Sequence, residues 1–238
     1  MGEQLAIVDL GTVAYQRAHA LQQALVAARL HEQVSDVLLV LEHPHVYTLG
    51  RGADEKFILA PRAQVPVIRV SRGGQVTYHG PGQLVAYPIL KLEGPAQDVG
   101  RYLRQLEQVM IAALARHGVC AQRRDRLTGV WIGARKIASI GVGIRRWVTY
   151  HGLALNLSTD LSYFDSIVPC GIEGCQMTSL ARLGREDIGR AEFTNSLCEN
   201  FRSVFAYSRL TYPSVETIWG WSDLRPTSAE PPADEARG

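Results

Sequence analysis

The chain has 238 residues, of which 46% are hydrophobic and 20% are charged, and its formal net charge at pH 7 is +2. This length and composition are typical of a soluble globular protein with one large domain or two small ones. A net charge so near zero gives no electrostatic reason to expect a nucleic-acid or membrane partner, and no apolar stretch is long enough to span a bilayer. The chain has four cysteines and no apolar leader, so we expect a cytoplasmic protein with free thiols.

The first third of the chain alternates between strand and helix patterns. The run LAIVDLG (5–11) predicts a strand, and residues 13–33 predict an amphipathic helix, because apolar residues recur there at helical spacing. The run DVLLVLE (36–42) is almost continuously apolar and has the length of a buried strand. A further short strand is expected at VYTLG (46–50).

The middle of the chain predicts several short strands and one long helix. Strands are expected at 66–71, 75–80 and 83–90, with a turn at Gly80-Pro81-Gly82 that suggests a hairpin. Residues 99–118 predict a helix closed by Gly118. The alternating runs TGVWIG, KIASIGVGI and WVTYHGLALNLS then predict an antiparallel meander.

The last predicted helix covers 186–207, and the Pro-rich, charged residues 223–238 predict a disordered tail. Strands and helices mix without strict βαβ alternation, so we expect a single α/β (α+β) domain over residues 1–222 with a mixed sheet.

The segment RGGQVTYHGPGQ, from Arg72 to Gln83, admits two interpretations. It could be a hairpin with incidental polar groups, or it could be a binding wall, because Gly73 and Gly74 allow a ligand to approach the backbone closely. It matches neither a P-loop nor a dinucleotide-binding fingerprint.

The segment VPCGIEGCQMTSL places Cys170 in a loop between Pro and Gly. Its C-x4-C spacing with Cys175 lacks a second ligand pair, so a zinc site is not expected. A thiol nucleophile would need a cation or base beside it, and the candidates are His79, His151 and Lys136. A structural or incidental cysteine remains the alternative.

Lys136 begins an otherwise apolar run and is one of only three lysines in the chain. It could extend to water from the start of a strand, or it could be a partly buried amine that exchanges protons near neutral pH. His43 and His45, on either side of Pro44, are interpreted as structural residues or as residues that support the substrate site, not as metal ligands.

Three motifs together resemble one known family. RGGQVTYHGPGQLVAYPIL, RKIASIGVGIRRWVTYHGLALN and VPCGI…MTSL resemble the lipoyl(octanoyl) transferases, which move an octanoyl group from acyl carrier protein to a lysine of a lipoyl domain. LEHPHVYTLGRG also fits, and the resemblance runs from about Leu5 to Trp221.

The resemblance implies a fold like the catalytic domain of biotin and lipoate protein ligases, with a mixed, largely antiparallel sheet and flanking helices. It implies that Cys170 is the acyl-thioester nucleophile and Lys136 its partner, with no cofactor and no metal. The implied protein partners are octanoyl-acyl carrier protein, the lipoyl domains of 2-oxoacid dehydrogenase complexes and the glycine cleavage H protein. The implied substrate-binding residues are Arg72, Gly73, Gly74, Gln75, Val76, Thr77, Tyr78 and His79, then Ser139, Ile140 and Gly141, and then Gly152, Leu153 and Ala154.

Two other functions remain possible at this point. An ATP-dependent lipoate ligase would use the same fold, although nothing in the sequence resembles its adenylate site and Cys170 would have no role in it. A non-catalytic module that binds acyl groups or lipoyl domains is the third hypothesis.

Overall fold

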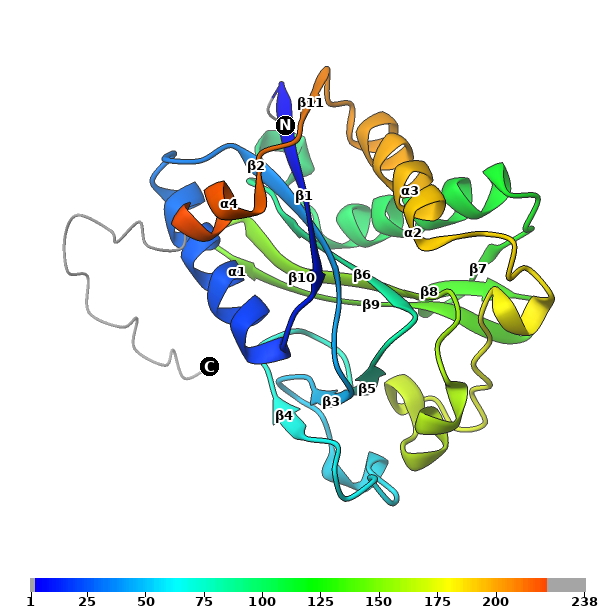
Figure 1. Cartoon of the computed structure of the whole chain (residues 1–238). Coiled ribbons are helices and arrows are strands. Elements are labelled where there is room, and N and C mark those ends of the chain that lie inside the picture. The colour runs from blue at the N-terminus through cyan, green and yellow to red at the C-terminus, as the bar shows by residue number, and fades with distance from the viewer. Residues whose placement is uncertain (1–2, 222–238) are drawn as a thin grey trace.

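The computed structural model describes residues 3–221, and its main feature is a large mixed sheet (Figure 1). The strands lie in the order β11-β1-β2-β6-β10-β9-β8-β7, and only the pairs β1–β11 and β1–β2 are parallel. Their bounds are β1 Gln4–Thr12, β2 Asp36–Glu42, β6 Gln83–Ile89, β7 Gln122–Arg124, β8 Leu127–Ile132, β9 Arg135–Arg145, β10 Val148–Asn156 and β11 Arg209–Thr211. The predicted α/β class with a largely antiparallel sheet is confirmed. The predicted tail at 223–238 lies outside the described residues.

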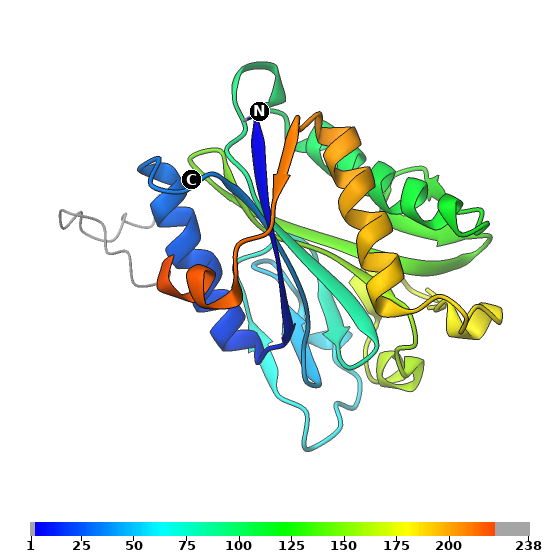
Figure 2. The same cartoon turned by 45° about the horizontal axis from the view of Figure 1, so that its top comes forward.

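Helices cover both faces of this sheet (Figure 2). Helices α2 (Val99–Arg116) and α3 (Arg190–Phe205) pack on one face, and α1 (Tyr15–Leu30) and α4 (Val215–Trp221) pack on the other. Alternate residues of β2 enter the two cores: Leu38 and Val40 face α2 and α3, whereas Val37, Leu39 and Leu41 face α1. Burial on both faces explains why this strand has a continuous apolar sequence.

The predicted meander of β8, β9 and β10 is confirmed, but the predicted hairpin is wrong. Strand β5 (Val76–His79) belongs to a separate sheet of three strands, in the order β4 (Val67–Arg69), β3 (Val46–Leu49), β5. A tight turn does precede β6, where the N–H of Gln83 donates to the carbonyl of Gly80 at 3.2 Å. However, β6 already has β2 and β10 on its two edges, so no edge is free to pair with β5.

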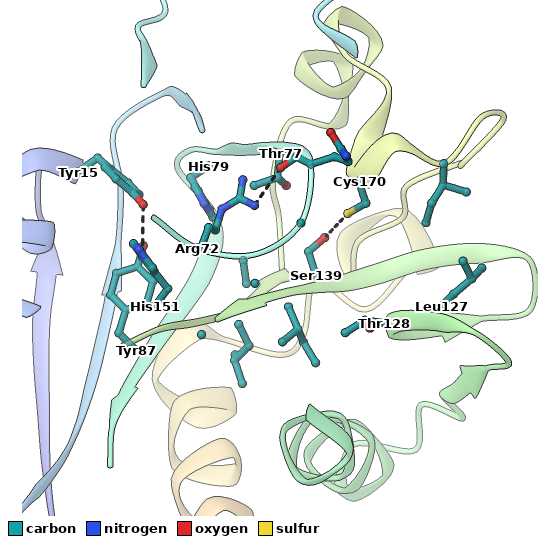
Figure 3. A pocket seen from close by; sticks show the side chains of 18 of the residues that line it. Tyr15, Arg72, Thr77, His79, Tyr87, Leu127, Thr128, Ser139, His151 and Cys170 are labelled. Carbon is teal, nitrogen blue, oxygen red and sulfur yellow. Dashed lines mark hydrogen bonds between the residues drawn. The ribbon is translucent and has the colours of Figure 1, made fainter. Parts of the chain in front are cut away.

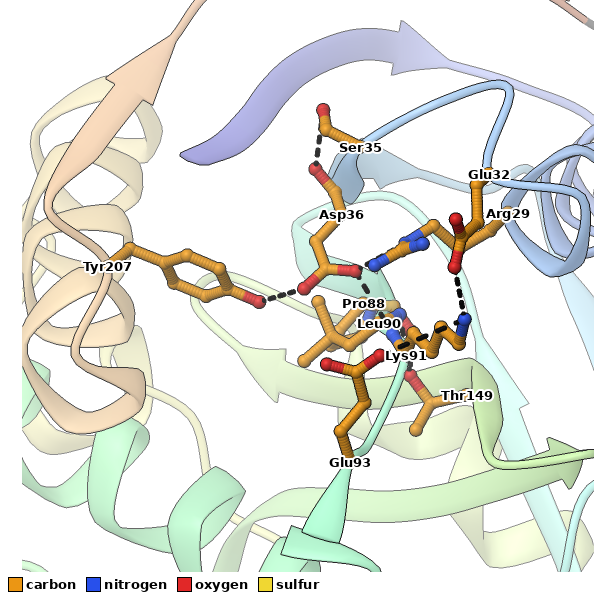
Figure 4. A network of polar contacts seen from close by, with 10 residues as sticks. All are labelled: Arg29, Glu32, Ser35, Asp36, Pro88, Leu90, Lys91, Glu93, Thr149 and Tyr207. Atoms are coloured by element: carbon orange, nitrogen blue, oxygen red, sulfur yellow. Dashed lines mark hydrogen bonds and ion pairs between the residues drawn. The ribbon is translucent and has the colours of Figure 1, made fainter. Parts of the chain in front are cut away.

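A buried carboxylate joins the helix layers to the sheet (Figure 4). Asp36, at the start of β2, accepts hydrogen bonds from Arg29 Nε at 2.8 Å, the N–H of Lys91 at 3.0 Å and the hydroxyl of Tyr207 at 2.7 Å. These three groups come from α1, from the segment after β6 and from the segment after α3. Among residues 3–221, no helix combines the length and apolar character needed to cross a membrane.

Candidate active site

A pocket of about 260 Å³ lies where the small sheet, the middle of the large sheet and the Cys170 loop meet (Figure 3). Twelve of the predicted site residues line it: Arg72, Gly74, Gln75, Thr77, His79, Ser139, Ile140, Gly141, Gly152, Leu153, Ala154 and Cys170. The three sequence motifs are far apart in the chain, and the fold brings all of them to this one cavity.

The Arg72 loop forms one wall of the pocket. The buried Arg72 guanidinium donates to the carbonyls of Gly73, Gln75 and Thr48 and to the Thr48 hydroxyl, at 2.7–3.0 Å. The N–H of Gly73 donates to the carbonyl of Val142 in β9 at 2.8 Å. These bonds fix the loop against both sheets, where it lines the pocket. Binding of a substrate by this wall, one of the two interpretations of the segment, stays a prediction.

Strand alternation sorts the predicted residues on β5. Thr77 and His79 line the pocket, whereas Val76 and Tyr78 lie in the core of the small sheet. This is the side-chain period of two that a strand requires. Gly73 also lies outside the lining, since its backbone is paired with β9.

Cys170 lies in the 3-10 turn η4 (Pro169–Gly171) with φ +57°. A residue other than Gly or Asn seldom adopts this left-handed conformation, and such strain is concentrated at functional sites. The hydroxyl of Ser139 lies 3.8 Å from Cys170 Sγ (Figure 3).

Lys136 lies beside the thiol and is 1% exposed, so it does not extend to water. Its Nζ donates to Cys170 Sγ at 3.1 Å and to the carbonyl of Thr128 at 3.0 Å. The pairing of β8 with β9 shifts register just after Lys136, and such bulges redirect side chains. The backbone of Lys136 also pairs with the cysteine segment: its N–H donates to Gln176 and its carbonyl accepts from Thr178.

The surroundings of Cys170 favour the thiolate. Burial acts to raise the pKa of the thiol, but the ammonium of Lys136, with further help from Ser139 and Arg72, holds that pKa below its ordinary value. A lowered pKa at a cavity wall is the environment of a reactive cysteine. The other two thiol partners considered from the sequence, His79 and His151, line the pocket without a hydrogen bond to the sulfur among the described contacts.

Sequence reasoning assigned no substrate-site role to several residues that line the pocket: Tyr15, Tyr87, Arg126, Leu127, Thr128, His151 and Ile172. Tyr15, Tyr87 and His151 lie at the side away from Cys170 (Figure 3). One signal could have indicated His151, because the pentapeptide VTYHG occurs at both 76–80 and 148–152, and both histidines line the pocket. Burial lowers the pKa of His151 to about 3, so its ring is neutral at physiological pH.

The histidines around Pro44 support the pocket instead of lining it. His43 is fully buried and bonds the carbonyl of Val13 at 2.6 Å and the Tyr87 hydroxyl at 2.7 Å. His45 bonds the Tyr78 hydroxyl at 2.7 Å and stacks on Tyr163. Within residues 3–221, no group of three or more His, Cys, Asp or Glu side chains is arranged to hold a metal ion.

Over most of its length, the chain is similar to known proteins. Residues 14–202 match the family described as the lipoyl protein ligase A/B catalytic domain. An octanoyltransferase of Gloeobacter violaceus is 53% identical over 167 residues, which cover 70% of this chain and 75% of that protein. An octanoyltransferase of Syntrophobacter fumaroxidans is 40% identical over 219 residues, which cover 89% of this chain and 96% of the relative.

A solved structure shares the fold at low sequence identity. The archaeal bipartite lipoate protein ligase from Thermoplasma acidophilum superposes with a TM-score of 0.68 at 14% identity, covering 93% of this chain and 91% of that one. The predicted likeness to lipoate ligase catalytic domains is confirmed. By its matched domain and its curated relatives, this chain belongs to the lipoyl protein ligase A/B catalytic-domain family, on its octanoyltransferase branch.

Proposed function

We propose that this chain, an acyltransferase of the octanoyltransferase family, carries an octanoyl or lipoyl group on Cys170 while transferring it from acyl carrier protein to a lysine of a lipoyl domain. The observation that supports this most directly is the 3.1 Å contact between Lys136 Nζ and Cys170 Sγ at the wall of the pocket. A thiolate is the effective nucleophile toward a thioester, and an adjacent ammonium favours it.

In the first half-reaction, the Cys170 thiolate adds to the carbonyl carbon of the donor thioester. The intermediate collapses by breaking the bond to the donor sulfur, and the Lys136 ammonium protonates that departing thiolate. The products are an acyl-Cys170 thioester, a neutral Lys136 amine and the free carrier thiol. Exchange of one thioester for another is close to thermoneutral, so this step is reversible.

In the second half-reaction, the neutral amine of the acceptor lysine adds to the acyl-Cys170 carbonyl. The Lys136 amine takes the proton that the acceptor nitrogen must lose, and Cys170 leaves as a thiolate. The ion pair is thereby restored, and the product amide is more stable than the thioester. The greater stability of the amide drives the overall transfer.

The acceptors are lipoyl-domain proteins, as the octanoyltransferase and lipoate-ligase relatives imply. We extend this to the lipoyl domains of 2-oxoacid dehydrogenase complexes and the glycine cleavage H protein. The donor thioester is already activated, so the proposed reaction consumes no ATP. We also propose that residues 1–222 form the catalytic domain and that the enzyme acts in the cytoplasm, where a reducing environment keeps such a thiol free.

The test is to trap the acyl-enzyme. The protein is mixed with octanoyl-acyl carrier protein in the absence of acceptor, and intact mass followed by peptide mapping should place one octanoyl group on Cys170. The Cys170→Ser variant should carry none, because a serine hydroxyl forms an alkoxide far less readily. An adduct on Cys120, Cys175 or Cys198 instead would contradict the assignment.

Steady-state kinetics separate the transferase from the alternatives. Carrier-bound octanoate and apo lipoyl domain, varied together, should give parallel double-reciprocal lines, because the carrier leaves before the acceptor reacts. Intersecting lines, with activity only from ATP and free octanoate, would favour a ligase. Binding of the octanoyl carrier without transfer to any lysine would favour a passive binding module.

A further inference from the structure

One peptide group in β8 holds Lys136 by its carbonyl and is itself held by a buried carboxylate. The carbonyl of Thr128 accepts from Lys136 Nζ at 3.0 Å. The N–H of the same peptide group belongs to Gly129 and donates to Oε1 of Glu107 in α2 at 3.0 Å. A continuous path of hydrogen bonds thus runs from Glu107 through this peptide and Lys136 to Cys170 Sγ.

Both oxygens of Glu107 are engaged, and its side chain is fully buried. Oε2 accepts from Arg104 at 2.7 Å and from Arg123 Nε at 3.0 Å, while Oε1 is left for the N–H of Gly129. The two arginines are partly exposed and are themselves linked, since Arg123 donates to the carbonyl of Arg104. A buried carboxylate is therefore fixed in orientation as well as charge-compensated.

The Gly129 position shows how closely this peptide fits the lysine. Its φ is +134°, which strongly favours glycine, and a Cβ there would lie 2.6 Å from Lys136 Cε and 2.8 Å from the carbonyl oxygen of Ala138. The lysine stem therefore packs directly on the backbone at Gly129. A rotation of this peptide would move the acceptor of Lys136 and the surface on which its stem lies.

We propose that Glu107 is a positioning residue for acyl transfer, acting on Lys136 through the Thr128–Gly129 peptide. The role in transfer depends on the function proposed above for the Lys136–Cys170 pair. By fixing the N–H of Gly129, Glu107 aims the carbonyl of Thr128 at Nζ. One ammonium hydrogen is thereby committed to that carbonyl and another to Cys170 Sγ.

The physical basis is polarisation as well as geometry. A peptide whose N–H donates to a carboxylate carries more negative charge on its carbonyl oxygen, and such cooperativity is strongest in a buried environment of low dielectric. Of the three hydrogens on the ammonium, the two hydrogen bonds leave one to protonate the departing donor thiolate. Releasing the carbonyl would let Nζ leave the sulfur, and small misplacements of a catalytic group slow reactions steeply.

Glu107→Gln is the sharpest variant because it keeps the shape of the side chain. An amide has one acceptor oxygen and one NH2, so it cannot accept from Gly129 and from both arginines at once. The measured quantities are the rate of Cys170 alkylation by iodoacetamide against pH, together with kcat and KM. We expect alkylation at pH 7 to slow by about threefold or more, kcat to fall by about tenfold or more, and KM for the octanoyl donor to stay within about threefold.

Whether alkylation becomes slower or faster distinguishes a positioning role of Glu107 from an effect of its charge alone. Loss of a negative charge near the sulfur would by itself favour the thiolate and speed alkylation. The positive charges of Lys136, Arg72, Arg104 and Arg123 would remain and would favour the thiolate as well. Slower alkylation therefore requires that Lys136 has moved. Unchanged or faster alkylation, with kcat preserved, would overturn the proposal.

The matched control is Asp36→Asn, which alters a second buried carboxylate with three hydrogen bonds, at the start of β2 (Figure 4). It should lower the melting temperature but leave alkylation and kcat unchanged at permissive temperature. If Glu107→Gln matches this control in every readout, Glu107 only stabilises the fold.

A second variant tests the proposal in case Glu107→Gln folds poorly. Arg123→Met removes one partly exposed hydrogen-bond donor to Glu107 and should lower kcat, by less than Glu107→Gln does. The test for this variant is kcat, because loss of the Arg123 charge would by itself slow alkylation. No effect of Arg123→Met, where Glu107→Gln does not fold, would count against the proposal. Alkylation needs no acyl donor, so slower alkylation in a protein that forms no octanoyl adduct would refute the proposed function while leaving the positioning by Glu107 supported.

Discussion

Replacing Lys136 with Met should suppress the reactivity of Cys170. Met has a similar length but no charge, so the Coulomb attraction between Nζ and Sγ is lost. At the observed separation of 3.1 Å, that attraction is about 1.3 kcal/mol if the pair is screened as in bulk water, and about 5 kcal/mol at an effective dielectric constant of about 20. Burial, which raises the pKa of the thiol, would then be opposed mainly by Ser139 and Arg72.

The expected loss of reactivity follows from these limits. About 1.4 kcal/mol corresponds to a factor of ten, so the equilibrium constant for ionisation of the Cys170 thiol should fall by about tenfold or more. The rate of alkylation should fall by up to the same factor at pH values below the thiol pKa and should recover as the pH is raised. Lys136→Arg should retain faster alkylation than the Met variant yet fail in transfer, because a guanidinium does not give up its proton.

The assay is iodoacetamide labelling from pH 5 to pH 10, followed by mass mapping in a Cys120→Ser background, because Cys120 is exposed. The remaining thiols should react slowly near neutral pH: burial raises the pKa of Cys198 to about 12 and also raises that of Cys175. An unchanged pH profile for Cys170 in the Met variant would refute the ion-pair argument and with it the proposed role of Lys136.

Other buried groups lead to three more expected outcomes. Tyr207→Phe removes a hydrogen bond of 2.7 Å to the carboxylate of Asp36 and should lower the free energy of unfolding by about 1.5–3 kcal/mol in urea titrations. Burial lowers the pKa of His43 to about 4 and of His151 to about 3, so below pH 6.5 the unfolded chain binds more protons than the native one. The free energy of unfolding should therefore decrease by about 2 kcal/mol per histidine between pH 7 and pH 5. Gly152→Ala should abolish folding or transfer, because its Cβ would lie 2.3 Å from a backbone carbonyl of β6.

Each of these has a control in the same chain. Tyr212 is 67% exposed, so Tyr212→Phe should leave stability unchanged. Gly189 has a φ of −70°, and among the described residues no heavy atom lies within 4 Å of the position that a Cβ would take there, so Gly189→Ala should be tolerated. For the histidines, His43→Gln should flatten the acid loss of stability, and an equally steep loss would mean that other groups cause it.

Much of the fold followed from local patterns in the sequence. The helical spacing of Tyr15, Ala18, Leu21, Leu25 and Ala28 predicted α1, and all five side chains are buried. The hairpin failed because strand pairing is non-local: turn residues at 80–82 show that the chain reverses, but not that β5 and β6 join different sheets. Strand β11 and helix α4 were missed because segments of three and seven residues carry too little periodicity to stand out.

The candidate site divides in the same way. Residues within continuous motifs, such as Ser139 and Gly152, could be found from sequence. Tyr15 could not, because it reaches the pocket from a helix most of whose other buried residues pack the core. Glu107 was harder still to find from the sequence. A charged residue between Leu106 and Gln108 has the pattern of a solvent-exposed helix position, whereas the structure buries it completely.

The burial of Lys136 shows why side-chain patterns were insufficient here. A lysine at the start of a strand normally reaches water, but the backbone of Lys136 pairs with Gln176 and Thr178 on one side while the bulge with β8 redirects its side chain on the other. The same pairing anchors the segment that carries Cys170, so backbone hydrogen bonds help to hold Lys136 and Cys170 together. Since those bonds do not depend on side-chain identity, substitutions at Gln176 should be tolerated far better than any change that shifts the β8–β9 bulge.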